Sequence, residues 1–316
     1  MIEPAASAIP VVSTALVALV IASLLLAFLY PAFRRAIEGT DPATRSFAVL
    51  CYGLMAPVTS IVVALLSMHP EVSRFLVPEH CHRGACGSHI PAVDPRSIGG
   101  FGLAAAGGGL AFFALLILGN ALLAGQRRFR TLFGLARQDP ARGYHLLESD
   151  DVVAWCCGLI RPKIVVSRGL VSRLDSAQLD VVLAHEAAHA ARLDNLRVLL
   201  LRWATALWPA SRHRVRTDLR NDCESACDTA ALAAVADRQV FAEALETLVR
   251  FSNVDEPSRA VAFDHRENPV RLAELPDDPC STRGAARVWL ALSIVWLIQV
   301  LVITSTSHYL VEWVGL

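Results

Sequence analysis

Four long apolar runs constrain the fold of this chain more than any other feature. The first, Val11 to Tyr30, has 20 residues and no charge, which is enough to cross a bilayer as a helix. It is too long for the apolar core of a signal peptide, and the tail before it carries Glu3 and no basic residue. We therefore interpret it as a retained transmembrane helix. Three further runs, at 47–68, 101–124 and 288–304, predict three more.

The distribution of basic residues predicts the orientation. They crowd the 31–46 loop and both ends of the 125–287 segment, whereas the N- and C-terminal tails have none. By the positive-inside rule, both termini lie outside a cell (inner or plasma) membrane and the long segment lies in the cytosol. Arginines in the 69–98 loop weaken this signal. The net charge of zero gives no reason to expect direct nucleic-acid binding through bulk electrostatics.

The expected domain organisation follows from these spans. We predict a mainly α protein with four transmembrane helices and a cytosolic α+β domain of gluzincin-like zinc metallopeptidase type. The predicted units are residues 1–124 (three spans and the outer loop 69–98), 125–286 (the cytosolic domain), and 287–316 (the fourth span and a short outer tail).

The cytosolic segment contains the motif HEAAH, residues 185–189. Asp175 and Gln178 form a capping-box pattern before an apolar period of 3.6 residues, which predicts an amphipathic helix. His185 and His189, at i and i+4, project from one face of that helix and can bind one Zn²⁺. Glu186 is then placed to accept a proton from a water molecule at the metal.

A tetrahedral catalytic zinc needs a third protein ligand. Position 192 is Arg and position 195 is Asn, so the metzincin pattern of a glycine and a third histidine is absent. Glu224 follows on a strongly helical run, with Arg220 and Asp228 on the same stripe. A solvated salt-bridge ladder would explain that stripe by itself. Next to HEAAH, we favour Glu224 as the third ligand.

HEAAH, the downstream ESACD (residues 224–228) and the upstream GLIRPKIVVSRGL together resemble the BlaR/MecR family of integral-membrane zinc metallopeptidases. The resemblance covers roughly residues 140–275 and extends to the order of the spans, three before the zinc domain and one after. In zincins of this type, the Asp four residues after the ligand Glu orients a ligand histidine. The resemblance therefore implies that Asp228 holds His185.

The resemblance also implies a function. Members of the family act as antirepressors, so the expected partner is a BlaI/MecI-type winged-helix repressor that is cleaved or inactivated, and self-cleavage is a further expectation. The beta-lactam receptors of the family carry a penicillin-binding sensor domain after the fourth span. This chain ends at Leu316, so we expect a member that lacks that domain.

Two other functions stay open. HtpX-like quality-control proteases share the HExxH motif, although they carry two spans before it and two after it. A signal transducer with a structural zinc site is the other alternative, although such a site needs no glutamate at position 186.

Three further segments carry weaker predictions. A hairpin at 152–166 is the candidate edge for binding a substrate backbone by β-addition, or a plain structural cover for the helix. The apolar segment 196–208 is either a core helix or one lying at the membrane surface. A helix is expected at 239–251, and His265 is a candidate for stabilising an oxyanion.

The outer loop concentrates histidines and cysteines. His69, His80, His82 and His89 fall close to Cys81 and Cys86. A disulfide between Cys81 and Cys86 is one interpretation, and a metal-sensing site built from the two cysteines and some of the histidines is another.

Overall fold

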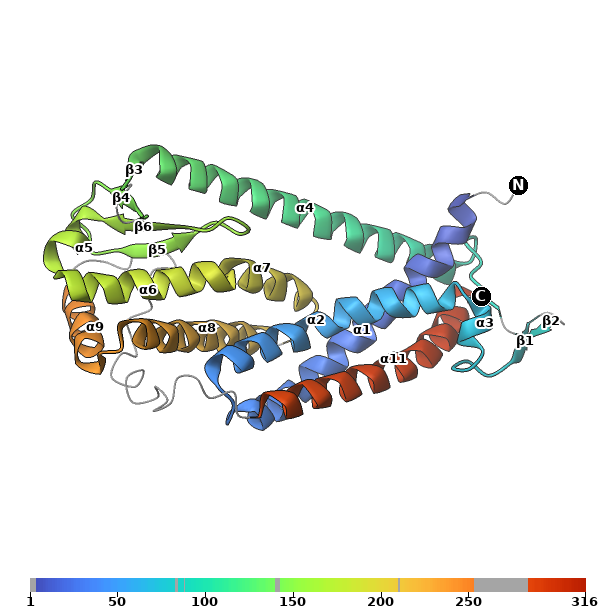
Figure 1. Ribbon diagram of the computed structural model, residues 1–316. Helices are drawn as coiled ribbons and strands as arrows, with labels where there is room; N and C mark the ends of the chain where they lie inside the picture. Colours follow the sequence, from blue (N-terminus) through green and yellow to red (C-terminus); the bar gives the residue numbers. More distant parts are fainter. Residues whose placement is uncertain (1–3, 83–84, 88, 140–142, 210, 253–283) are drawn as a thin grey trace.

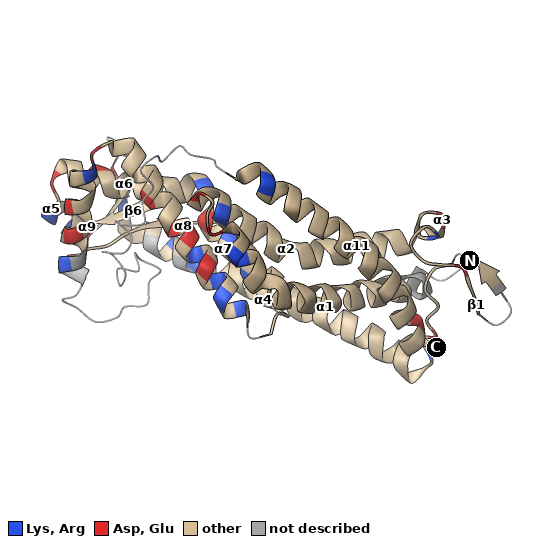
Figure 2. Cartoon of the chain, turned by 90° about the horizontal axis from the view of Figure 1, so that it is seen from below, with Lys and Arg blue, Asp and Glu red and all other residues tan. Residues whose placement is uncertain are grey.

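The computed structural model describes residues 4–82, 85–87, 89–139, 143–209, 211–252 and 284–316. It is mostly helical and elongated, with a bundle of long helices at one end and a small sheet with five helices at the other (Figure 1). Among the described residues, four helices are long and apolar enough to cross a membrane: α1 (Pro4–Ile37), α2 (Pro42–Ser67), α4 (Ile98–Leu135) and α11 (Ala285–Gly315). The chain is therefore a multi-pass membrane protein. Figure 2 shows these helices almost free of charged residues along their apolar lengths.

Helices α1, α2 and α11 pack against one another, whereas α4 buries little of its surface. Tyr52 of α2 donates a hydrogen bond to the carbonyl oxygen of Leu26 in α1 at 2.9 Å, and Ser60 donates to that of Ala15 at 2.7 Å. These bonds satisfy side-chain hydroxyls inside an apolar bundle, where water is not available. Many of the exposed side chains in the apolar part of α4, among them Phe112 and Phe113, are large and apolar, as expected of a lipid-facing helix.

All four helices extend beyond the predicted spans, and α4 and α11 extend furthest at their C-terminal ends. Helix α4 continues past residue 124 to Leu135 and leads directly into the sheet. Helix α11 continues past residue 304 to Gly315, where the sequence suggested a short outer tail. The reason is packing, because the last turns of α11 bury His308, Val311 and Glu312.

The sheet has four short strands in the order β3-β4-β6-β5. Strands β4 and β6 pair in parallel and the other neighbours pair antiparallel. The predicted hairpin is present as β5 and β6, with Ala154 opposite Val166 and a turn that contains Gly158 at φ 109°. The strand bounds are β3 Ala136–Gln138, β4 His145–Leu147, β5 Ala154–Cys157 and β6 Lys163–Ser167.

In the described residues between the sheet and position 252, five helices follow: α5 (Arg168–Arg173), α6 (Ser176–Arg192), α7 (Asp194–Ala204), α8 (Ser211–Val235) and α9 (Arg238–Ser252). Helix α6 begins with the predicted capping box, in which the backbone N–H of Gln178 donates to Asp175 Oδ1 at 2.8 Å. Its apolar side chains Leu179 and Val182 pack with Val166 under the sheet. Helix α6 also contacts α8 and α9, so α6 lies at the centre of this end of the molecule. Helix α9 matches the helix expected at 239–251.

The segment after α6 belongs to the core. Leu201 of α7 and Trp208 are each 1% exposed and pack with residues of α1 and α2. The ring of Trp208 lies edge-on to those of Tyr30 and Tyr52, with centroids 6.0 and 6.1 Å apart. One face of residues 196–208 is therefore packed in the core, in line with the first of the two expectations for this segment.

Helix α8 is joined to the membrane helices by a buried carboxylate. Asp222 accepts hydrogen bonds from Arg34 of α1 and from Arg45 of α2, the latter at 2.6 Å. On the same helix, Asp218 accepts a hydrogen bond from Tyr30 at 2.7 Å. These contacts fix α8 against the ends of α1 and α2.

The opposite end of the molecule carries α3 (Pro70–Ser73) and a two-stranded hairpin of β1 (His80–His82) and β2 (Ala85–Gly87). Cys81 and Cys86 are opposite each other in this hairpin and form a disulfide. The end of α11 lies beside this loop (Figure 1).

Candidate metal centre

The two histidines of HEAAH point at each other from consecutive turns of α6. Their Nε2 atoms are 3.0 Å apart and their ring centroids 4.7 Å apart. This arrangement follows from the i, i+4 spacing, which places both side chains on one helix face. His185 is 1% exposed, so this face is turned into the protein.

Glu224 of α8 supplies the third group. Its carboxylate oxygens lie 3.6 Å from His185 Nε2 and 3.4 Å from His189 Nε2. Ligands about 2.0–2.1 Å from a tetrahedral zinc lie about 3.3–3.4 Å from one another, by simple geometry. The separations of 3.0 Å between the two Nε2 atoms, of 3.6 Å from His185 Nε2 to Glu224 Oε2 and of 3.4 Å from His189 Nε2 to Glu224 Oε1 are all close to this value. The two nitrogens and one oxygen also match the donor set of catalytic zinc sites.

His185 has a carboxylate at its other ring nitrogen. Asp228 Oδ1 lies 2.8 Å from His185 Nδ1, and both side chains are buried. Burial opposes the charged imidazolium, but the hydrogen bonds with Asp228 and Glu224 outweigh it and raise the pKa of His185 to about 10. With Nδ1 held by Asp228, the ring presents Nε2 to Glu224 and His189. This is the placement that the resemblance implied for Asp228.

His189 has an equivalent partner that sequence reasoning missed. Its Nδ1 lies 2.8 Å from Asp194 Oδ2, and Cys227 donates its S–H to the same oxygen at 3.4 Å. Burial again opposes the charged imidazolium, yet Asp194 and Glu224 raise the pKa of His189 to about 10. Both ligand histidines therefore have their tautomer set by a buried aspartate.

The chain reaches Asp194 through an unusual turn. Leu193, between α6 and α7, has φ 55° and ψ 43°, the left-handed region that non-glycine residues seldom adopt. The turn makes Asp194 the first residue of α7 and lets it reach back to His189. An aspartate five residues after the second histidine was the available signal, but only the turn gives it meaning.

Glu186 lies next to the three groups and is 3% exposed. Burial raises the pKa of Glu186, while the charges of His185 and His189 lower it and the charge of Glu224 raises it further. The backbone of Cys156 in β5 also forms a hydrogen bond to Glu186. A raised pKa suits a carboxylate that must accept a proton and later return it.

Strand β5 forms one edge of the four-stranded sheet and contacts α6. Asn195 donates hydrogen bonds to the carbonyl oxygens of Cys156 and Gly158 at 2.9 and 3.2 Å, which fixes the end of β5 to the start of α7. The hairpin predicted as a substrate edge is therefore placed beside Glu186.

The structure thus brings together His185, Glu186, His189, Glu224 and Asp228, all of which were named from the sequence. Cys81 and Cys86 lie at the other end of the molecule. His265, named for oxyanion stabilisation, lies outside the described residues.

Comparison with known proteins agrees with the position of this site. The family model described as BlaR1 peptidase M56 matches residues 153–275, a range that includes β5, HEAAH and Glu224. No curated protein and no solved structure matches the chain. The family match indicates a metallopeptidase, and the family implies a metal, typically zinc. The likeness of the domain to gluzincins stays a prediction.

Proposed function

Since this match supports a BlaR1/MecR-type family member, we propose that the chain is a membrane-embedded zinc endopeptidase that acts in signal transduction. One observation carries the proposal: the Nε2 atoms of His185 and His189 and the carboxylate of Glu224 meet within 4.8 Å of one another. Each histidine is also fixed by a buried aspartate. A structural site would gain nothing from the buried Glu186 beside it.

The chain's own residues divide the chemistry among them. His185, His189 and Glu224 would hold the zinc, which when bound lowers the pKa of a water molecule and polarises the scissile carbonyl. Glu186 accepts the proton of that water and delivers it to the leaving amine. Asp228 and Asp194 keep the two imidazoles in the tautomer that presents Nε2 to the metal.

The edge of β5 supports a mode of substrate binding. An extended peptide that adds to this edge places its backbone over α6, near Glu186, whose carboxylate already contacts the backbone of Cys156. Backbone hydrogen bonds would give affinity for an extended segment, and side-chain contacts would give selectivity.

For the substrate we propose a BlaI/MecI-type winged-helix repressor, together with possible cleavage of the chain itself, because the resemblance implies an antirepressor. This requires the metal centre to face the cytosol and both termini to lie outside. The basic residues of the 31–46 loop support that orientation. So does the disulfide at the opposite end, because disulfides persist in oxidising compartments.

The proposal is tested with the full chain in detergent micelles and a purified repressor of this class. Glu186→Gln should keep the zinc content of the wild type and cleave about 10²–10⁴-fold more slowly, because it removes the proton acceptor without removing a ligand. Glu224→Ala should lose both zinc and cleavage. The measurements are metal content and the rate at which new N-termini form.

Asp180→Asn is a matched control, since Asp180 is an exposed carboxylate on the same helix as Glu186. It should change neither quantity. Equal cleavage by the wild type and Glu186→Gln would remove Glu186 from the mechanism. Zinc binding without cleavage of any protein would instead support the structural zinc site of a non-catalytic transducer.

A further inference from the structure

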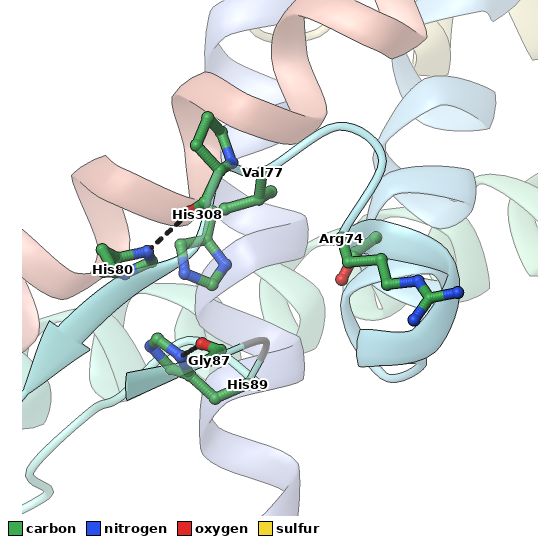
Figure 3. A pocket seen from close by; sticks show the side chains of 8 residues that line it. Arg74, Val77, His80, Gly87, His89 and His308 are labelled. Carbon is green, nitrogen blue, oxygen red and sulfur yellow. Dashed lines mark hydrogen bonds between the residues drawn. The ribbon is translucent and has the colours of Figure 1, made fainter. Parts of the chain in front are cut away.

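A second cluster of metal-ligand residues lies at the end of the molecule opposite HEAAH. His80 and His89 come from the hairpin loop, and His308 and Glu312 come from the last turns of α11. One ligand atom from each of the four lies within 4.8 Å of the other three. Figure 3 shows the three imidazole rings gathered at a small pocket.

The nitrogens are directed at one carboxylate. His80 Nε2 and His89 Nε2 lie 2.8 Å from the two different oxygens of Glu312, and His308 Nε2 lies 3.3 Å from one of them. His308 and Glu312 are buried, and the two loop histidines are partly exposed. The cluster therefore has a fixed inner half on α11 and an outer half that reaches solvent.

The other ring nitrogens of the loop histidines are occupied. His80 Nδ1 lies 3.0 Å from the carbonyl oxygen of Pro78, and His89 Nδ1 lies 2.9 Å from that of Gly87. A carbonyl oxygen only accepts, so each Nδ1 carries a proton and donates it. The neutral ring then presents the lone pair of Nε2 to Glu312, and backbone carbonyls orient metal-binding histidines in the same way.

Two nitrogen lone pairs facing one carboxylate repel it unless a cation lies between them. Protons could fill that role by making both rings imidazolium, and a divalent metal ion could fill it with all four side chains as ligands. Arg74 also lines the pocket, but its guanidinium lies apart from the three rings (Figure 3). The cysteines of the loop are joined in a disulfide and leave the ligand set to imidazole and carboxylate.

We propose that His80, His89, His308 and Glu312 form a binding site for a divalent transition metal at the disulfide-bearing end of the molecule. Three imidazoles and one carboxylate suit Zn²⁺, Cu²⁺ or Ni²⁺, whereas Ca²⁺ and Mg²⁺ prefer oxygen ligands. The site goes beyond the proposed peptidase function, because it shares no residue with the centre on α6.

The metal would join two segments that are far apart in the sequence. The loop already contacts α11 through the backbone N–H of Ala92, which donates to Glu312 at 3.0 Å, and through that of Asp94, which donates to the carbonyl oxygen of Gly315 at 2.9 Å. Bound metal would add ligands from both sides of this contact. The loop should therefore be held to α11 more firmly when the site is loaded.

The test is the zinc content of the full chain in detergent after equilibration with Zn²⁺ and removal of free metal. The wild type should hold two zinc ions per chain. His308→Ala and Glu312→Gln should each hold one, because each removes a ligand at this site and leaves the centre on α6 intact. Glu224→Ala should also hold one, and Glu224→Ala with His308→Ala should hold none.

His69→Ala is the control, because His69 is an exposed histidine of the same loop outside the cluster, and it should hold two. A zinc content of one in the wild type that His308→Ala leaves unchanged would overturn the proposal, because the four side chains would then form ion pairs only. A content of two that neither His308→Ala nor Glu312→Gln lowers would overturn it as well. Two zinc ions without any peptide cleavage would count against the proposed function alone.

A second measurement does not depend on counting zinc ions or on peptidase activity. Trypsin cuts after arginine, and Arg74 and Arg96 lie at the two ends of the loop. Zn²⁺ should slow cleavage at these residues tenfold or more in the wild type and in Glu224→Ala, where only this site is complete. Equal rates with Zn²⁺ and with a chelator would contradict the proposal.

Discussion

At the scale of single residues, each histidine of the candidate metal centre on α6 is paired with a buried aspartate. Each ligand histidine has its Nε2 in the centre and its Nδ1 against a carboxylate, Asp228 for His185 and Asp194 for His189. Cys227, which follows Glu224 on α8, donates to Asp194 and so links the two sides. The motif ESACD thus supplies the proposed third ligand, Glu224, a partner for His185 in Asp228, and a hydrogen bond from Cys227 to Asp194, the partner of His189.

Replacing either aspartate should weaken zinc binding. Asp194→Asn and Asp228→Asn keep the size of the side chain but remove the charge that fixes the imidazole, so we expect a loss of about tenfold to hundredfold in zinc affinity. Competition with a chromophoric chelator measures it. Asp180→Asn should leave the affinity unchanged, and an unchanged affinity in both buried variants would show that the aspartates do not hold the ligands.

Zinc binding at this centre should depend on pH. Burial opposes the charge on His185 and His189, but their carboxylate partners raise the pKa of both imidazoles, so the pair holds an extra proton at neutral pH in the zinc-free chain. The two Nε2 atoms are 3.0 Å apart and hydrogen-bonded to each other, so one proton lies between them. Zinc must displace this proton, so affinity should rise with pH, by about one decade per pH unit around neutrality. The protonated pair of imidazoles also stabilises the zinc-free fold. This stabilisation is fully present below about pH 6.5, the pKa of histidine in the unfolded chain. It is lost as the pH rises through the higher pKa of the same imidazoles in the folded chain.

Calorimetry in buffers of different ionisation enthalpy counts the released protons. The His308→Ala variant restricts the titration to the centre on α6. Release of about one proton at neutral pH is expected, and release of none would mean that both imidazoles are neutral before zinc binds.

The sequence identified the residues of this centre that a helix period places together. His185 and His189 are one turn apart, and Glu224 and Asp228 are one turn apart, so local geometry alone gives each pair. Asp194 was missed because its contact depends on the left-handed turn at Leu193. His308 and Glu312 were missed because they lie within an apolar helix and far from the loop histidines in the sequence. His80 and Glu312, for example, are 232 residues apart.

At the scale of elements, α8 connects the membrane helices to the metal centre. One face of α8 presents Glu224 and Asp228 to α6, and another presents Asp222 to Arg34 and Arg45 at the ends of α1 and α2. A movement of α1 or α2 would therefore reach the helix that carries the third ligand. The spans themselves were predictable from apolar length, but this connection was not, because it depends on which charges become buried.

Removing Asp222 should destabilise the chain strongly. Asp222→Ala leaves two partly buried guanidinium groups without their carboxylate, and breaking such a buried pair costs about 3–5 kcal/mol. We expect a clear fall in the apparent melting temperature of the detergent-solubilised chain. Asp150→Ala, which removes an exposed ion pair with Arg168, should cost less than about 1 kcal/mol. Equal effects of the two variants would contradict this role for Asp222.

At the scale of the whole molecule, two metal-ligand clusters occupy opposite ends of one bundle (Figure 1). One lies with a disulfide, and the other lies with five helices and a sheet that carry most of the charged residues (Figure 2). Because the long apolar helices between the two ends would cross the membrane, we expect the two ends to lie in different compartments.

The disulfide offers a test of that orientation. After mild reduction of intact cells, a membrane-impermeant maleimide should label Cys81 and Cys86, because this end faces outward. Cys81→Ala combined with Cys86→Ala should abolish the labelling, and Cys156 and Cys157 should react only after the cells are opened. Labelling of Cys156 in intact cells would reverse the orientation.

The central claim is proteolysis of a cytosolic repressor by the centre on α6. The most direct measurement compares new protein N-termini in cells that express the wild type with those in cells that express Glu186→Gln. We predict that a winged-helix repressor is cut only with the wild type, which would also give the scissile bond. Fragments from many membrane proteins would contradict the antirepressor role and favour a quality-control protease, and identical N-termini under every stress tried would contradict proteolysis itself.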